Sequence, residues 1–556
     1  AAVVCGNGNV ELACDHVIYC NNNVLKTVQL SGIYADSKTF VDQPMRHDPA
    51  VVLEAFHRLP ENPTQAEVHS FLSENFYPAG ADVEQWIPTD WNADPAFLNT
   101  IPDDKLRMWA SELNSIWKDL GKMITIEARA NLNRTSLLEI PHPFISPSAG
   151  GSTGGRFREI YYWDSYWIIQ GLLVSNMTTS AGYMIQNLAH LVSTLGRCPN
   201  GGRVYYEQRS QPPLLTQMVR SYVDETKDLT ILESVLPVLD IEYTFWMEHR
   251  SVILPGGAVL NRYRADSNVP RPEGYKEDLE TGRHVALGEQ GELYRNLASG
   301  AESGWDFSSR WFVDENKLSS IDVANIIPVD LNVFMGANEL SLAALHLMMA
   351  EEAVAAEDRA NHQQLVEYYL GKSAARREAI DAYLWSSATK SWSDYNITSG
   401  TPREGLYPSS YLPLWCPALV EAKQYRDAFF SLVGSELLAY PAGVPTSLRD
   451  TGQQWDFPNG WAPLQMLLIT ALREGGRVVS TETDWAFQLA QQWVSTNYAA
   501  YEANGIMYEK YDVESTGVVG SGGEYDVEFG FGWTNGVALQ LLSLYPELQS
   551  PSPSSS

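Results

Sequence analysis

An aspartate enclosed by aromatic residues is the first feature of this chain suited to acid–base chemistry. Asp306 lies between Trp305 and Phe307 in residues 301–311, which read AESGWDFSSRW. Aromatic walls exclude water from a carboxyl group and raise its pKa, and a general acid needs a raised pKa at its working pH. The structural alternative is that Asp306 caps the following turn, with the next two serines inside that turn. Either way, proton transfer would need a second group.

Residues 507–536 form a second acidic region that could supply this group. They read MYEKYDVESTGVVGSGGEYDVEFGFGWTNG, and their acidic residues are Glu509, Asp512, Glu514, Glu524, Asp526 and Glu528. Residue types alone do not select one of these carboxylates as the partner of Asp306. The glycine-rich run at 517–523 predicts either a mobile flap that closes over a ligand and excludes bulk water, or simply a flexible loop.

Three arginines lie in separate loops that are rich in proline or glycine. Arg156 follows two glycines, Arg209 precedes the sequence SQPP, and Arg271 lies between two prolines. A guanidinium group binds vicinal hydroxyls through its fork of donors and also keeps a nearby carboxylate ionised. A single arginine of this kind is usually a solvated surface residue, but three in loops of this composition favour a polar binding site.

Two further stretches combine arginine, carboxylate, tryptophan and tyrosine with glycine. They are residues 154–166 (GGRFREIYYWDSY) and 454–463 (QWDFPNGWAP). Aromatic faces cover the C–H surfaces of a sugar ring, while charged side chains donate to and accept from its hydroxyl groups. The mixture therefore suits a small, neutral, hydroxyl-rich ligand. The alternative is that each stretch is an aromatic core segment with satisfied charges.

Helical spacing dominates the chain from about residue 64 onward. Leu331, Phe334, Leu342 and Leu345 recur on one face of a helix, and Asp484 is placed to cap another. Further periodic segments lie near 104–131, 165–176, 182–195, 214–224, 229–249, 362–385, 418–437, 461–474 and 536–544. Loops rich in Gly and Pro separate them at 139–156, 198–213, 254–305, 399–415, 440–460 and 502–535.

This alternation predicts an all-α fold, a closed ring of helical hairpins whose functional loops gather at one end. We expect residues 1–60 to form an irregular N-terminal segment packed on the ring, and residues 61–545 to form one catalytic domain. Residues 546–556, which end in PSPSSS, are expected to form a flexible tail.

Composition restricts the partners and the compartment. The chain of 556 residues has 38 Lys and Arg against 68 Asp and Glu, a formal net charge of −30. Such a field repels nucleic acid and anionic lipid but is indifferent to a neutral substrate. No run of about 18 apolar residues is present, so no membrane contact is expected. The chain does not begin with Met, which suggests a mature, secreted form whose leader has been removed. Sequons for N-glycosylation at Asn133, Asn176 and Asn396 agree with secretion.

Five cysteines bear on the same question. Cys5, Cys14 and Cys20 lie near the N-terminus, and Cys198 and Cys416 lie far from them and from each other. The N-terminal run lacks a fourth ligand at zinc-site spacing, so we expect a disulfide between two of its three cysteines, with the pairing left open.

The stretches at 154–166 and 454–463 resemble the two signature motifs of the trehalase family, inverting hydrolases of α,α-trehalose. The second matches at every position, and the first departs where Thr153 replaces the usual proline. The resemblance implies an (α/α)6 toroid, with Asp306 as general acid and Glu509 as general base. It implies trehalose as the substrate and no cofactor. The residues that it implies contact sugar are Arg156, Trp163, Asp164, Asn200, Arg209, Ser210, Gln211, Arg271, Glu273, Gly304 and Glu524. The calcium-binding pattern of the neutral fungal branch, D-x-D-x-D-G, is missing from this sequence, so no metal is expected.

The sequence also allows other functions. The chain could be another inverting α-glucosidase on the same toroid, or a sugar-binding homologue without turnover. Residues 150–154 (GGSTG) formally fit the nucleophile elbow of serine hydrolases, but the prolines at 141, 143 and 147 argue against the strand that this motif requires. The same glycines lack the Lys-Ser/Thr of a phosphate-binding loop.

Overall fold

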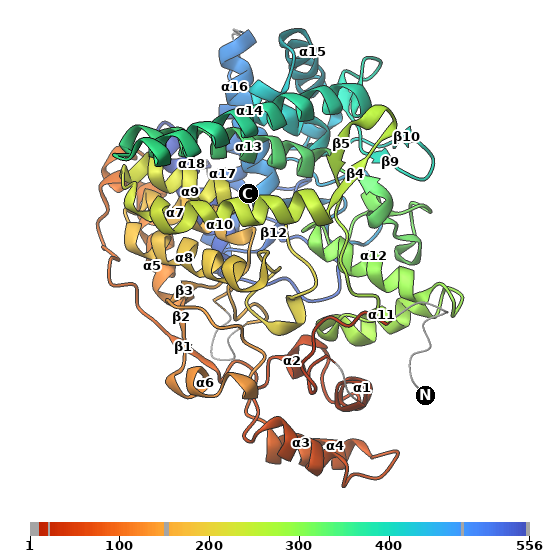
Figure 1. Ribbon diagram of the computed structural model, residues 1–556. Helices are drawn as coiled ribbons and strands as arrows, with labels where there is room; N and C mark the ends of the chain where they lie inside the picture. The colour runs from red at the N-terminus through yellow and green to blue at the C-terminus, as the bar shows by residue number, and fades with distance from the viewer. Residues whose placement is uncertain (1–9, 21–22, 150–154, 480–482, 552–556) are drawn as a thin grey trace.

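The computed structural model describes residues 10–20, 23–149, 155–479 and 483–551, and Figure 1 shows that helices dominate it. The α-helices are α1 (Asn23–Leu30), α2 (Lys38–Val41), α3 (Pro49–Phe56), α4 (Gln65–Asn75), α5 (Asp104–Leu120), α6 (Ile126–Ala130), α7 (Asp164–Val174), α8 (Thr178–Leu195), α9 (Leu215–Thr226), α10 (Thr230–His249), α11 (Tyr275–Gly282), α12 (Gln290–Glu302), α13 (Val329–Glu352), α14 (Ala356–Tyr383), α15 (Ala422–Val433), α16 (Ala462–Val479), α17 (Trp485–Asn504) and α18 (Gly532–Leu544).

Six elements form a closed inner ring among the described residues. α7 contacts α9, α9 contacts α13, α13 contacts the 3-10 helix η10 (Pro408–Trp415), η10 contacts α16, α16 contacts α18, and α18 returns to α7. Outer helices pack against these inner elements: α8 on both α7 and α9, α10 and α14 on α13, α15 on η10, α17 on α16 and α5 on α18. The predicted (α/α)6 toroid is therefore confirmed.

Outer and inner helices differ in how their apolar residues are distributed. In α5, Leu106, Trp109, Leu113 and Trp117 repeat every three or four residues and are buried, and the Asp103 side chain caps the helix start. α13 is instead buried on most of its circumference. It is long and apolar enough to cross a bilayer by length and composition, the one such helix in the searched ranges, but 72% of its most apolar window is buried inside the protein.

The strands are short and antiparallel. They are β1 (Val83–Gln85), β2 (Gly121–Ile124), β3 (Phe144–Ile145), β4 (Ser251–Ile253), β5 (Val259–Asn261), β6 (Ile326–Ile327), β7 (Trp385–Ser386), β8 (Ser391–Trp392), β9 (Tyr395–Asn396), β10 (Thr401–Pro402), β11 (Asn459–Trp461) and β12 (Lys510–Asp512). One pairing bears on function. β11 pairs with β12, with Trp461 opposite Lys510, and so joins the stretch 454–463 to the acidic region 507–536.

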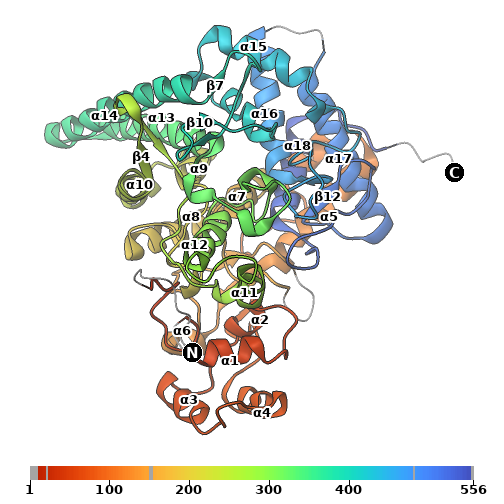
Figure 2. The same ribbon diagram turned by 90° about the vertical axis from the view of Figure 1, so that its right-hand side faces the viewer.

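The N-terminal region is more regular than expected. α1 to α4 lie together at one end of the molecule in both views (Figures 1 and 2), and α1, α2 and α3 fall within the segment 1–60 that was expected to be irregular. They bury an apolar cluster that includes Phe40, Phe71 and Phe76 and is completed by Tyr206, a residue between α8 and α9. The α1–α4 segments are short, which explains why periodicity did not reveal them.

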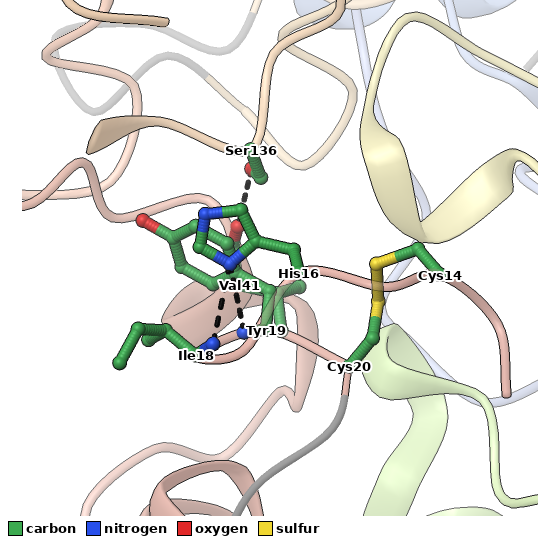
Figure 3. Close-up of a disulfide and its surroundings, with 7 residues drawn as sticks. All are labelled: Cys14, His16, Ile18, Tyr19, Cys20, Val41 and Ser136. Carbon is green, nitrogen blue, oxygen red and sulfur yellow. Dashed lines mark hydrogen bonds between the residues drawn. A yellow bond between two sulfur atoms is a disulfide. The ribbon is translucent and has the colours of Figure 1, made fainter. Parts of the chain in front are cut away.

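A disulfide closes the start of this region. Cys14 and Cys20 are joined (Figure 3), so a bridge between two of the three N-terminal cysteines is present, as predicted. Cys5 lies outside the described residues. Inside the closed loop, Nδ1 of His16 accepts from the backbone N–H of Ile18 at 3.2 Å.

Two segments expected to be loops contain structural elements. The segment 254–305 holds β5, α11 and α12, and 399–415 holds η10. Periodicity missed α12 because it is polar and contains glycine. Gly300 is needed there, since a Cβ at that position would lie 2.7 Å from the Phe307 ring. η10 escaped because its two prolines, Pro408 and Pro413, are poor α-helix formers. The expected helix over 104–131 ends at Leu120, where β2 begins.

Candidate active site

A pocket lies where the loops that lead into the inner helices meet. Its empty space is about 660 Å³, a figure that includes the opening to solvent. The segments that line it precede α7, α9, α13, α16 and α18. The lining residues are Arg156, Phe157, Tyr161, Trp163, Asp164, Asn200, Tyr206, Arg209, Gln211, Arg271, Glu273, Gly274, Ala301, Gly304, Asp306, Trp455, Trp461, Glu509, Glu524, Tyr525, Phe531 and Trp533.

Asp306 reaches this pocket from the end of α12. Gly304, in the left-handed region with φ of 75°, makes the turn, and a Cβ there would lie 2.7 Å from the Trp163 ring. Burial raises the pKa of Asp306 to about 6, against the opposing charge of Arg271. The short turn that follows is capped by the Ser308 hydroxyl, which accepts from the N–H of Arg310. Asp306 is therefore not the cap of this turn.

The backbone after Asp306 is braced by a buried carboxylate from the second signature stretch. Asp456 accepts hydrogen bonds from the Ser308 hydroxyl at 3.0 Å and from the N–H and hydroxyl of Ser309 at 2.8 Å each. Further along, the fully buried Arg310 pairs with Asp330 at 2.7 Å and with Asp394 at 2.7 Å. These bonds fix the loop from which Asp306 projects.

Glu509 lies just before β12 and is 2% exposed. One of its carboxylate oxygens accepts a hydrogen bond from the Tyr525 hydroxyl at 2.9 Å, while the other has no partner among the described residues. Burial raises the pKa of Glu509 to about 7, and the neighbouring Lys510 opposes that rise. A clamped carboxylate with one open oxygen is suited to accept a proton from a water molecule.

Three carboxyl groups influence one another in the pocket. Burial raises the pKa of Asp164 well above its usual value, and the charges of Glu509 and Asp306 raise it further. Like charges in a water-poor site do not all ionise together. The pKa values of Asp306, about 6, and Glu509, about 7, lie close together near neutral pH, so they do not by themselves assign acid and base.

The three predicted arginines are at the pocket, and each is held by a carboxylate. Arg209 donates to Glu273 at 2.6 Å and to the amide oxygen of Asn200 at 2.7 Å. Arg271 donates to Asp278 at 2.6 Å and to Glu524 at 3.0 Å.

Arg156 donates to Asp36, a residue of the N-terminal region, at 3.0 Å. Burial acts to raise the pKa of Glu273, but Arg209 and Arg271 outweigh it and hold the pKa below its usual value. A polar rim of ionised groups in fixed positions results.

Tryptophans form the apolar part of the lining. Trp455 stacks on Trp461 with ring centroids 4.0 Å apart and on Trp305 at 5.8 Å. Trp163 packs against Trp455 at 5.7 Å and edge-on against Trp533 at 5.8 Å. A polar rim over aromatic faces is the arrangement expected for a sugar site.

Comparison with known proteins agrees with this geometry. A profile of the trehalase family matches residues 32–546. The chain belongs to the trehalase family. It is 42% identical to trehalase from Homo sapiens over 546 residues, which cover 96% of this chain and 90% of that protein. It is 41% identical to trehalase from Apis mellifera over 558 residues, covering 97% and 86%. The solved structure of the neutral trehalase from Saccharomyces cerevisiae is similar, with a TM-score of 0.57 and 25% identity over 76% of this chain and 80% of that one.

This trehalase-family chain brings most of the predicted site residues together, with one exception. Ser210 is fully buried outside the lining, and its hydroxyl donates to the carbonyl of Cys198 at 2.6 Å. The expectation that Ser210 contacts ligand therefore finds no support in the structure. Its backbone N–H donates to the buried Glu302, which orients the loop that carries Arg209 and Gln211.

Several lining residues were missed by sequence reasoning. They are Phe157, Tyr161, Tyr206, Gly274, Ala301, Tyr525, Phe531 and Trp533. Most lie within or beside the quoted motifs, so proximity to a motif was the available signal. Trp455 and Trp461 were part of a quoted stretch but were not singled out. In the searched residues, no group of three or more His, Cys, Asp or Glu side chains could hold a metal ion.

The glycine-rich run predicted as flap or loop is tied to its surroundings. The N–H of Asp512 donates to Val518 at 3.0 Å, and the N–H of Gly520 donates to Lys510 at 3.1 Å. The side-chain amide of Asn459 exchanges two hydrogen bonds of 2.9 Å with the backbone of Ser521. We refer to residues 518–525 as the flap. The segment 150–154, with Thr153 and the proposed elbow motif, lies outside the described residues.

Proposed function

We propose that this protein hydrolyses α,α-trehalose to two molecules of glucose as an inverting glycoside hydrolase. Three observations support the proposal: membership of the trehalase family, a pocket with a polar rim over aromatic faces, and two carboxyl groups of raised pKa in its lining. The observation that carries it is the state of Glu509, clamped by Tyr525 on one oxygen and open on the other.

The mechanism assigns one proton transfer to each carboxyl group. Asp306 gives its proton to the oxygen that bridges the two anomeric carbons, and the bond from that oxygen to one glucose breaks. Glu509 takes a proton from a water molecule, whose oxygen attacks the freed anomeric carbon from the opposite face. One glucose leaves as the α anomer and the attacked glucose becomes the β anomer. A second proton exchange with solvent restores both carboxyl groups.

Binding is assigned to the rim. Arg156, Arg209, Arg271, Asn200 and Gln211 offer donors to hydroxyl groups. Glu273, Glu524 and Asp164 offer acceptors, and Trp163 offers an apolar face. One carboxylate oxygen of Glu273 has no partner among the described residues, so it is available to a sugar hydroxyl.

Product analysis tests the reaction. The protein is incubated with trehalose, maltose and soluble starch, and released glucose is measured. Glucose from trehalose alone is expected, while preferential release from maltose or starch would indicate a different α-glucosidase and no release would indicate a binding homologue. Proton NMR before mutarotation should show equal α and β glucose. Exclusively α product would contradict inversion. In a sugar-analogue complex, the two carboxyl groups should lie about 6.5–9.5 Å apart.

We further propose that the chain is secreted and N-glycosylated. Asn133 and Asn176 are exposed, Asn396 is half-buried in β9, and Cys14 and Cys20 form a disulfide that would persist in an oxidising compartment. Expression in a secretory host followed by peptide-N-glycosidase treatment and mass spectrometry tests this. Unmodified sequons together with free Cys14 and Cys20 thiols would contradict it.

A further inference from the structure

Lys510 is a buried cation for which the mechanism above has no role. It directly follows Glu509 and has no exposed surface. Its ammonium donates to the side-chain oxygen of Gln454 at 2.8 Å and to the carbonyl of Gly522 at 3.1 Å. Neither acceptor is charged. Removing an ammonium group from water without a hydrogen-bonded counter-ion is costly, so its retention here calls for an explanation.

The first acceptor connects Lys510 to both catalytic loops. The amide nitrogen of Gln454 donates to the backbone carbonyl of Asp306 at 2.6 Å and lies 3.4 Å from the Tyr525 hydroxyl. The same hydroxyl donates to Glu509. The ammonium of Lys510 therefore ends a chain of hydrogen bonds that passes through the acid loop and the clamp of the base.

The second acceptor connects Lys510 to the flap. Gly522 lies two residues before Glu524, which pairs with Arg271, and three before Tyr525. The flap lies so close that a Cβ on Gly520 would be 2.8 Å from the Lys510 side chain, and a Cβ on Gly523 would be 2.8 Å from Gln454. The glycines therefore permit the flap to lie directly on these two side chains.

Charge provides the third connection. The Lys510 ammonium opposes the rise in the pKa of Glu509 that burial causes. Conversely, burial lowers the pKa of Lys510, while the carboxylates of Glu509 and Asp306 act to raise it. The ammonium thus interacts with both carboxyl groups, although it bonds to neither.

We propose that Lys510 is a positioning residue that fastens the flap over the pocket and supplies the counter-charge for ionised Glu509. The proposal rests on the proposed function for the role of Glu509. The position of the flap does not depend on that role, so the two can be tested apart.

The main test replaces Lys510 by methionine, which has similar length but neither charge nor donor. Loss of the ammonium raises the pKa of Glu509. The pH optimum of kcat/KM is the midpoint of the pKa values of the acid and the base, so it moves to higher pH whichever of the two titrates first. We expect a shift of about half a unit or more and a loss of roughly 10–100-fold in kcat/KM.

Two matched variants separate charge from fastening. Lys510→Arg keeps the charge but not the geometry, so the pH optimum should stay near that of wild type while KM rises. Asn459→Ser removes another side-chain anchor of the flap, the one at Ser521, without a change of charge, so KM should rise and the pH optimum should stay. If Lys510→Met does not fold, as judged by thermal unfolding, Lys510→Gln takes its place in every measurement.

Two measurements test whether Lys510 holds the flap, and neither depends on catalysis. Hydrogen exchange of residues 518–525 should be faster in Lys510→Met than in wild type, and trehalose should bind the Asp306→Asn variant several-fold more weakly when Lys510→Met is added. Unchanged exchange together with an unmoved pH optimum would overturn the proposal, as would a fall in kcat with neither change. A wild-type protein that does not hydrolyse trehalose would overturn the proposed function, while the exchange measurement would still decide the flap.

Discussion

Asp306 and Glu509 reach the same pocket from supports of different kinds. The loop of Asp306 is braced from behind by Asp456 and by the buried ion pairs of Arg310, all of which lie outside the pocket lining. Glu509 is held from the pocket side by Tyr525, a lining residue that the flap carries. One carboxyl is therefore positioned by the scaffold, and the other by a segment that also contacts ligand.

The two kinds of support predict different effects of substitutions on binding and turnover. The backbone that carries Asp306 is held by contacts that lie outside the pocket lining. The orientation of Glu509 depends on where the flap lies, so a substrate that holds the flap also completes the base. Changes behind Asp306 should therefore reduce turnover at any substrate concentration, while changes in the flap should affect binding and turnover together.

The largest effect is expected from removing either proton-transfer group. Asp306→Asn and Glu509→Gln should each lower kcat by at least about 10²-fold, because neither amide can exchange the proton that the reaction needs. Steady-state kinetics on trehalose measures this, with circular dichroism and thermal unfolding as controls for the fold. Glu524→Gln should instead act mainly on binding. If Glu524→Gln abolishes turnover and Glu509→Gln does not, the roles of these two glutamates are reversed.

A smaller effect is expected from the brace behind the acid. Asp456→Asn keeps the volume of the side chain but presents an amide group to donors of the Ser308 and Ser309 turn, so Asp306 should lose its alignment. We expect kcat to fall roughly 10-fold or more with KM changed less. Thr451→Val is the matched control, since it removes one hydrogen bond to Asp456 and keeps the carboxylate. Equal effects of both variants on kcat would contradict a bracing role for the Asp456 carboxylate.

Sequence predicted the parts of this comparison that are local. The aromatic neighbours of Asp306 are adjacent in the chain, so its raised pKa could be inferred from residue types. α5 and α13 were found because their apolar residues recur at helical spacing. The clamp on Glu509 could not be found in this way, because Tyr525 reaches it only once the flap has folded back over β12.

Local reasoning failed where the orientation of a side chain decides the outcome. The family resemblance implied that Ser210 contacts ligand, but its hydroxyl donates to the Cys198 carbonyl, a bond between residues 12 positions apart. Asp456 and Lys510 belong to quoted stretches, yet nothing in those stretches shows what they contact. The ring of helices could be predicted from the sequence. The sequence did not show that η10, which contains two prolines, occupies one of the inner positions of the ring.

Removing the clamp of the base should have a still smaller effect. Tyr525→Phe deletes the hydroxyl that donates to Glu509 and keeps the ring that lies 4.4 Å from the Arg156 guanidinium. The lost hydrogen bond favoured the ionised carboxylate, so the pKa of Glu509 rises and the pH optimum of kcat/KM should move upward. We expect a loss of about 3–10-fold at the wild-type optimum. A pH profile that coincides with that of wild type would mean that Tyr525 does not control the ionisation of Glu509.

The smallest expected effect concerns stability and follows from the burial of the same carboxyl. The pKa of Glu509 in the folded protein, about 7, lies above its ordinary value of 4.5, so the folded state retains a proton that the unfolded state has released. Its contribution to stability is fully present below pH 4.5 and is lost as the pH rises to about 7. The glutamine of the Glu509→Gln variant does not titrate in this pH range. Relative to wild type, this variant should gain roughly 1–3 kcal/mol of stability between pH 4.5 and pH 8. Denaturation midpoints at both pH values measure the gain.

For Asp306→Asn the pH window lies lower, between 3.8 and about 6, so most of its gain in stability should already be present at pH 6. If the difference in unfolding free energy between Glu509→Gln and wild type does not change with pH, the pKa of Glu509 is not raised in the folded protein. Glu509 would then be ionised at neutral pH, and water would reach its carboxylate more easily than its exposure of 2% indicates.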